Sequence, residues 1–195
     1  MHELALTCPE DRVEAIGEAL DALDALSVSV EDADADTEAE RADWVRLTQS
    51  QFAPGEITPS FWIVPTWHEP PAAAQRIIRL DPGLAFGTGT HPTTRMCLRW
   101  IATRGTQALG RTLDYGCGSG ILAIAAALHG AHPVDAVDID EAAVRATRDN
   151  AAANGVELNA GLPELAQGRY DTVLANILAT PLKVLAPLLC AHVAA

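Results

Sequence analysis

A glycine-rich stretch and an acid downstream of it are the residues of this sequence whose spacing points most directly to chemistry. The stretch reads Asp114-Tyr-Gly-Cys-Gly-Ser-Gly120 after a short apolar segment, and Asp138 ends a second apolar segment. Glycines allow positive φ and close approach of the backbone to a ligand, and the following helix presents free N–H groups at its N-terminus. A carboxylate at the next strand's tip can accept hydrogen bonds from both ribose hydroxyls. The pattern predicts a nucleoside cofactor site.

The spacing of the glycines distinguishes between classes of cofactor. Dinucleotide sites use G-x-G-x-x-G, whereas this chain has Gly116, Gly118 and Gly120 without a glycine at the third expected place. This tighter turn favours S-adenosylmethionine over a dinucleotide such as NAD, and a purely structural turn is the third alternative. The alternative for Asp138 is a solvated acid that ends a strand, and Asp140 is better suited to helix capping.

Two further segments carry polar groups suited to a ligand site. Residues 84–94 combine two glycines, four threonines and a histidine, so the loop either folds over a cofactor or caps the helix that starts at Pro92. Within it, His91 is either a base or a residue that only forms hydrogen bonds. Asn176 closes a strand at the edge where open α/β sheets bind ligands, or simply ends that strand. We identify no obvious general base, so the catalytic residues stay unassigned.

The elements that must position these residues alternate along the chain. Apolar patterns predict strands at 60–64, 76–80, around Leu113, at 134–139, at 170–176 and, more weakly, at 156–159. Helical spacing predicts helices after Pro92 and at 121–128, 141–154 and 181–195. This alternation implies an α/β fold with a parallel sheet, which ends here before the strand expected after the last helix.

The N-terminal part differs in composition from the rest. Residues 3–7 and 26–30 alternate like strands around an apolar-faced helix, which predicts one β-α-β unit. Residues 31–40 include six acids and no large apolar side chain, which is typical of a mobile linker, and a short helix is predicted near 44–47. We expect a small N-terminal unit with its linker at 1–40, a connecting segment at 41–80 and the main α/β domain at 81–195.

Composition restricts the partners. The 195-residue chain is 49% hydrophobic, has a net charge of −13 and contains one lysine, so a basic protein is a better partner than nucleic acid. No apolar stretch is long enough for a membrane span and no basic secretory start is present, so we expect a cytoplasmic protein without membrane contact. The cysteines lack metal-site spacing and are expected to be reduced, mostly buried thiols without bound metal: Cys8, Cys97, Cys117 and Cys190.

Four blocks together resemble the bacterial methyltransferases of ribosomal protein L-eleven: residues 80–94, 113–125, 137–140 and 175–179. The resemblance implies a Rossmann-like class I methyltransferase fold and S-adenosylmethionine as cofactor. It places Thr94, Gly116, Asp138 and Asn176 at the cofactor, and we add Gly118 from the same turn. The implied substrates are amino groups of a large-subunit ribosomal protein, both lysine side chains and the N-terminal amine.

The sequence also departs from that family. Its members have a recognition domain of two β-α-β units and a full seven-stranded sheet, whereas this chain shows one such unit and stops at Ala195 before the later strands. Two hypotheses follow: a protein methyltransferase, or a truncated, non-catalytic remnant that binds the cofactor without transferring its methyl group. An NAD-dependent oxidoreductase is a third, which the glycine spacing disfavours.

Overall fold

The computed structural model describes residues 52–81, 91–104 and 109–194, all of which belong to one unit of the chain, residues 49–195. The predicted β-α-β unit, the acidic segment 31–40, the helix near 44–47 and most of the threonine-rich loop lie outside the described residues. In the part that the structure describes, no helix is long and apolar enough to cross a membrane.

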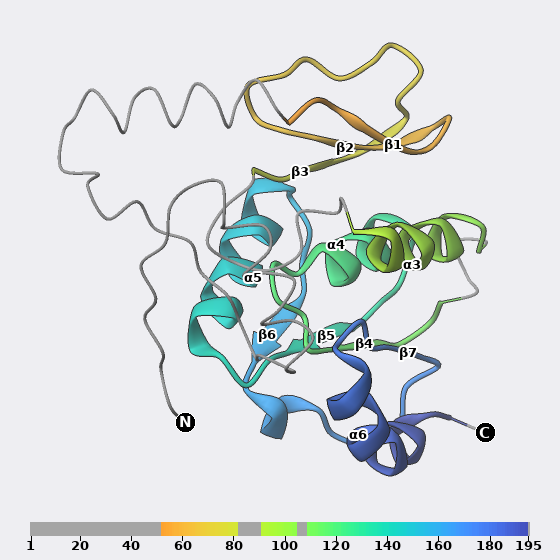
Figure 1. Ribbon diagram of the computed structural model, residues 1–195, viewed down its shortest axis with the longest axis vertical. Coiled ribbons are helices and arrows are strands. Elements are labelled where there is room, and N and C mark those ends of the chain that lie inside the picture. Colours follow the sequence, from red (N-terminus) through yellow and green to blue (C-terminus); the bar gives the residue numbers. More distant parts are fainter. Residues whose placement is uncertain (1–51, 82–90, 105–108, 195) are drawn as a thin grey trace, which may run out of the picture. The chain divides into compact units, whose positions relative to one another are not determined.

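A four-stranded parallel sheet forms the framework of this unit (Figure 1), in the order β6-β5-β4-β7. Its central strands, β4 (Thr112–Tyr115) and β5 (Val134–Val137), are buried at every residue, as expected for strands covered on both faces. The outer strands are β6 (Asn159–Gly161) and β7 (Thr172–Leu174). The predicted parallel α/β sheet is confirmed.

The weak strand predicted at 156–159 is wrong in its position. The structure uses 156 to finish the preceding helix: the Val156 N–H donates to the carbonyl of Ala151 at 3.1 Å, and Gly155 adopts a φ of 63°. This is the hydrogen-bond pattern of a glycine-terminated helix. The chain becomes free to pair with β5 only from Asn159, which lies opposite Asp135.

The helices lie on both faces of the sheet (Figure 1), with α3 (Pro92–Ala102), α4 (Ile121–Leu128) and α5 (Glu141–Ala153) on one and α6 (Ala179–His192) on the other. All four predicted helices are confirmed. The apolar α4 buries most of its length in the main core cluster. As predicted, Asp140 caps α5, its side chain accepting a hydrogen bond from the Ala142 N–H at 2.8 Å.

A second, three-stranded sheet precedes α3. It consists of β1 (Gly55–Thr58), β2 (Phe61–Val64) and β3 (Arg76–Arg79), with β1 antiparallel and β3 parallel to β2. The predictions for β2 and β3 are confirmed, whereas β1 is too short and polar to be detected by alternation. Phe61 and Ile78 belong to the same core cluster as Leu98 of α3. The side-chain amide of Asn154 at the end of α5 binds both backbone groups of Arg79, at 2.7 Å from its N–H and 2.8 Å from its carbonyl.

Candidate cofactor and acceptor site

The glycine turn after β4 has the predicted left-handed conformation. Gly116, Gly118 and Gly120 have φ values of 79°, 54° and 79°. A Cβ on Gly116 would overlap the side chain of Ile177, so a larger residue is excluded both by space and by φ. The Gly116 N–H donates to the Val137 carbonyl at 2.8 Å, which fixes the turn against the end of β5.

Asp138 follows β5 directly and is held toward this turn. One carboxylate oxygen accepts a hydrogen bond from the Gly118 N–H at 2.9 Å, and the other accepts one from the Asp140 N–H at 3.0 Å. The side chain is only half-buried. Because a carboxylate has about four acceptor positions, two remain for ligand hydroxyls. The turn and the acid, separated in sequence, form one hydrogen-bonded unit.

Thr94 and Asn176 come together from distant parts of the chain. The Asn176 side-chain N–H donates to the buried Thr94 hydroxyl oxygen at 2.9 Å. Thr94 lies in the first turn of α3, and Asn176 follows β7. This bond leaves the amide oxygen of Asn176 able to accept a hydrogen bond from another group. Like Gly116 and Asp138, Asn176 follows the carboxyl end of a parallel strand, and these ends share one edge of the sheet.

His91 serves as the N-cap of α3. Its Nδ1 accepts a hydrogen bond from the Thr93 N–H at 3.3 Å and lies 2.8 Å from the Thr93 hydroxyl oxygen. These contacts fit the interpretation of His91 as a hydrogen-bonding residue, and the interpretation as a base stays a hypothesis. The remaining threonines and glycines of the loop, at 84–90, lie outside the described residues.

Asp114 is a buried acid beside the candidate site, to which the sequence pattern assigned no role. It is buried in β4 under the glycine turn, and this burial raises the pKa of its carboxyl to about 7. A hydrogen bond from the Ala123 N–H at 3.1 Å lowers the pKa, and the charge of Asp138 raises it. The signal that could have identified it is an acid inside an otherwise apolar strand.

Cys117 lies within the turn but has no nucleophilic character. Burial, with the nearby charge of Asp114, raises the pKa of its thiol to about 12, although a hydrogen bond with Thr147 at 3.2 Å lowers it. The thiol is therefore protonated at neutral pH. Of the cysteines expected to be mostly buried, Cys117 is buried, Cys97 is half-buried and Cys190 is exposed, whereas Cys8 lies outside the described residues. The exposure of Cys190 follows from its position on the outer face of α6.

A closed polar network occupies the opposite, amino end of the sheet. The Asp135 carboxylate accepts hydrogen bonds from the Tyr170 hydroxyl at 2.8 Å, the Asn159 amide at 2.8 Å and the Arg111 guanidinium at 3.1 Å. The guanidinium carbon of Arg111 also lies 4.2 Å from the centre of the Tyr170 ring. These contacts connect β4, β5, β6 and the segment before β7.

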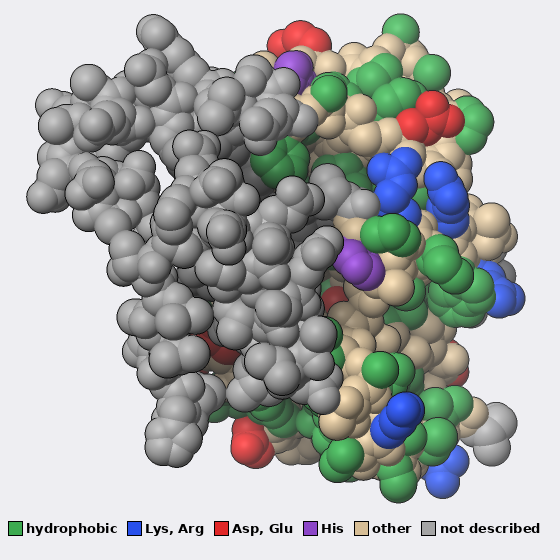
Figure 2. Space-filling model, in the orientation of Figure 1, with side chains coloured by type: hydrophobic (Ala, Val, Ile, Leu, Met, Phe, Trp, Pro, Cys, Tyr) green, Lys and Arg blue, Asp and Glu red, His purple; other side chains and the backbone are tan. Residues whose placement is uncertain are grey.

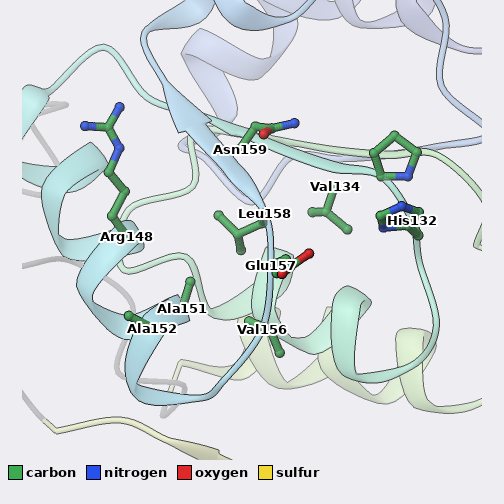
Figure 3. Close-up of a pocket in the computed structure, with 10 residues that line it drawn as sticks. His132, Val134, Arg148, Ala151, Ala152, Val156, Glu157, Leu158 and Asn159 are labelled. Carbon is green, nitrogen blue, oxygen red and sulfur yellow. The ribbon is translucent and has the colours of Figure 1, made fainter.

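A cavity of about 350 Å³ lies beside this end, between α5 and the chain entering β5 and β6 (Figure 3). Val134, Leu158 and Arg148 are among its lining residues, and the Arg148 guanidinium already donates to the Ala160 carbonyl at 2.6 Å. None of the residues predicted to bind a cofactor lines it. The carboxyl edge of the sheet is therefore the better candidate for the functional site.

A parallel sheet with a glycine turn after one strand and an acid after its neighbour defines a Rossmann-like protein of the class I methyltransferase type. The family model described as Ribosomal protein L11 methyltransferase (PrmA) matches residues 35–195. This chain belongs to that family.

Individual relatives agree with this assignment. A ribosomal protein L11 methyltransferase of Polaromonas sp. (strain JS666) is 58% identical over 251 residues, covering 99% of this chain and 84% of the relative. That of Thiobacillus denitrificans is 63% identical, covering 77% of this chain and 51% of the relative. The crystal structure of the ribosomal protein L11 methylase of Lactobacillus delbrueckii subsp. bulgaricus has a TM-score of 0.64 and 39% identity, covering 73% of this chain and 76% of that one.

The Polaromonas protein has residues that this chain lacks within the aligned region. The alignment extends over 251 residues, whereas this chain has 195, so at least 56 residues of the Polaromonas protein are aligned with gaps in this chain. The Thiobacillus alignment extends over 154 residues and needs no such gap to cover 77% of the chain. The chain therefore lacks residues that the Polaromonas relative has within the aligned region.

Proposed function

We propose that this chain transfers methyl groups from S-adenosylmethionine to amino groups of ribosomal protein L11. The observation that carries the proposal is the hydrogen bond between Thr94 and Asn176. It joins two of the four sequence blocks that carry the resemblance to the family, and it does so at the sheet edge that also holds the glycine turn and Asp138.

The residues present fit the cofactor. Asp138 would accept hydrogen bonds from the ribose hydroxyls, because its carboxylate is oriented by two backbone N–H groups and keeps free lone pairs. The turn containing Gly116 and Gly118 would lie against the nucleoside, where side chains larger than hydrogen are excluded. Thr94 and Asn176 would lie toward the reacting end. When bound, S-adenosylmethionine supplies an electrophilic methyl group on a sulfonium.

The acceptor must be presented as a neutral amine. A free lysine has a pKa near 10.4, so deprotonation at pH 7 costs about 4–5 kcal/mol. Among the described residues near Asn176, His91 is used as a helix cap, and Thr94 already accepts the Asn176 amide. We therefore assign the proton of the ammonium group to solvent water, which takes it before the transfer, and the catalysis to positioning. The Asn176 amide oxygen accepts a hydrogen bond from the neutral amine and aligns its lone pair with the methyl group.

The alternative, a remnant that binds the cofactor without transferring its methyl, is not favoured. The chain spans most of the Polaromonas relative and retains Thr94, Gly116, Asp138 and Asn176. The proposed division is still a recognition unit with its linker at 1–40, a connecting segment at 41–80 and a methyltransferase domain at 81–195. A basic substrate protein fits the net charge of −13, and we propose that the reaction takes place in the cytoplasm without direct contact to nucleic acid.

Two measurements test the proposal. Calorimetry should show binding of S-adenosylmethionine and of its demethylated product, and none of NAD. Incubation with purified ribosomal protein L11 and S-adenosylmethionine should then give a mass increase in methyl increments, and His91→Ala should keep most of the activity. Cofactor binding without any methyl transfer would establish the remnant, and a large loss of turnover in His91→Ala with unchanged cofactor affinity would establish a histidine base.

A further inference from the structure

The outward face of α3 carries an unusual combination of side chains. Met96 and Trp100 are 67% and 40% exposed, and Arg99 and Arg104 are exposed beside them. Their spacing of three or four residues places them on one side of the helix, with Arg95 at its border. Figure 2 shows basic side chains next to hydrophobic ones over this helix. We call these five residues the α3 surface.

The arginines of the α3 surface have no acidic partner among the described residues, whose ion pairs are Arg111 with Asp135 and Arg145 with Glu141. Arg95 donates to the backbone carbonyl of Glu56, and Arg99 donates to that of Ile57 at 3.2 Å.

The third arginine, Arg104, lies over the Trp100 ring, 4.4 Å from its centre. Within the part of the chain that the structure describes, these three positive charges have no acidic partner, although the net charge of the chain is −13. Tryptophan, methionine and arginine are also the residue types enriched in protein interfaces.

The α3 surface lies on the same helix as the proposed acceptor site. Thr94, which holds the Asn176 amide, is in the first turn of α3, and Met96 is two residues further along. A partner bound to this helix is therefore close to the group that would receive its amine. The arginines of the α3 surface repel lysines of a substrate, whereas the acidic remainder of the chain attracts them. This uneven distribution of charge orients a basic substrate on the chain.

We propose that the α3 surface docks the protein substrate through a patch on that substrate where carboxylates flank an apolar side chain. This inference rests on the proposed function and names the face that recruits the substrate. A protein fits better than RNA for two reasons. Nucleic-acid grooves use an extended set of free cations, whereas Arg95 and Arg99 here also bind backbone carbonyls. Base stacking needs an open aromatic face, whereas Arg104 covers one face of Trp100.

The test variant is Met96→Glu combined with Arg104→Glu, because neither side chain contributes to the buried core or binds a backbone group. The charge-reversal control is Arg169→Glu, at an exposed position before the amino end of β7. Arg169 donates a hydrogen bond to the Val193 carbonyl at 3.2 Å, so its variant is compared only after thermal unfolding shows that it folds. Trp100→Ala is a second variant that keeps the charges. Thermal unfolding and calorimetry with S-adenosylmethionine check that each protein folds and binds its cofactor.

Steady-state kinetics and calorimetry with purified ribosomal protein L11 then give the readout. For the double variant we expect a rise in KM and Kd for the protein of about 10-fold, with kcat nearly unchanged and a weaker salt dependence. Trp100→Ala should act in the same direction, and Arg169→Glu should match the unmodified chain. Equal KM and Kd values in all folded variants would overturn the docking proposal, as would loss of binding to a ribosomal RNA fragment instead of the protein. Binding of L11 without methyl transfer in the unmodified chain would overturn the proposed function alone.

Discussion

Two aspartates on the same strand have opposite surroundings. Asp135 lies in β5 near its amino end, and Asp138 follows the carboxyl end of that strand. The carboxylate of Asp135 is surrounded by side-chain donors from Arg111, Asn159 and Tyr170. Among the described residues, that of Asp138 accepts hydrogen bonds from two backbone N–H groups, and it is half-exposed. The described side chains nearly saturate one carboxylate, with three of about four acceptor positions used, whereas backbone groups orient the other and use two.

The hydrogen-bond donors around each carboxylate distinguish an acid that stabilises the fold from an acid that can bind a ligand. Burial alone would raise the pKa of Asp135, but hydrogen bonds from Asn159, Tyr170 and Arg111 outweigh it, and the pKa lies below its ordinary value. Such a group stabilises the fold, and its buried side-chain donors leave it too little acceptor capacity to hold both hydroxyls of a ribose. Asp138 is pre-oriented by backbone groups that do not compete with ribose hydroxyls for its remaining lone pairs.

Removing the Asp135 carboxylate should have the largest effect on stability. In Asp135→Ala, the Tyr170 hydroxyl and the Arg111 guanidinium lose their common acceptor, so we expect a loss of about 3 kcal/mol in the free energy of unfolding. Urea unfolding measures it. S-adenosylmethionine affinity of the folded protein should stay within twofold, and a selective loss of that affinity would contradict the structural role of Asp135.

Removing the Asp138 carboxylate should weaken cofactor binding strongly and change the stability of the fold only slightly. In Asp138→Ala, two charge-assisted hydrogen bonds to ribose are lost, and we expect about 100-fold weaker binding of S-adenosylmethionine by calorimetry. The free energy of unfolding should change much less than in Asp135→Ala. If Asp138→Ala binds the cofactor normally, the acid only ends its strand.

The hydrogen bond between Thr94 and Asn176 extends the comparison to the proposed acceptor. Thr94→Val keeps the volume of this buried residue but removes the oxygen that holds the Asn176 amide. We expect about a 10-fold lower kcat for methyl transfer, because a misoriented Asn176 no longer aligns the amine. Thr94→Ser serves as the control and should recover most of the activity. Equal kcat in Thr94→Val and the unmodified chain would remove Asn176 from its positioning role.

We expect the smallest effect at Asp114, the buried acid under the glycine turn. It concerns how the free energy of unfolding depends on pH. The unfolded state ionises Asp114 near pH 4, whereas the native state keeps it protonated up to its pKa of about 7. Its contribution to the free energy of unfolding is therefore complete at low pH and is lost as pH rises through 7. Between pH 6 and pH 7 we expect the chain to lose about 1 kcal/mol relative to Asp114→Asn, measured by urea unfolding. Parallel pH profiles would contradict the raised pKa.

The sequence predicts the strongly patterned elements well, for identifiable reasons, and it predicts a cofactor role for residues that the structure places at one edge of the sheet. The helix at 121–128 is uninterrupted and apolar, and the glycines and Asp138 have a spacing that few folds other than nucleoside-binding ones require. The predicted position of β6 was wrong, because Val156, whose sequence pattern favours a strand, takes part in the hydrogen bonds that end α5.

The role of Asp135 could not be assigned in advance. The position of Asp138 at the end of a strand predicts a ribose contact, whereas only the tertiary partners of Asp135 identify it as a structural acid. The burial of Asp114 depends on α4 packing over β4, and its local signal in the sequence is an acid inside an apolar strand.

The amide of Asn154 has a consequence for solubility. β3 ends the three-stranded sheet, and an edge strand of this kind is a template on which another chain can add a strand. By binding both the N–H and the carbonyl of Arg79, the Asn154 side chain occupies the position of a peptide unit in a neighbouring strand. A single side chain thus closes this part of the edge to intermolecular β-pairing, and protects the chain from self-association there.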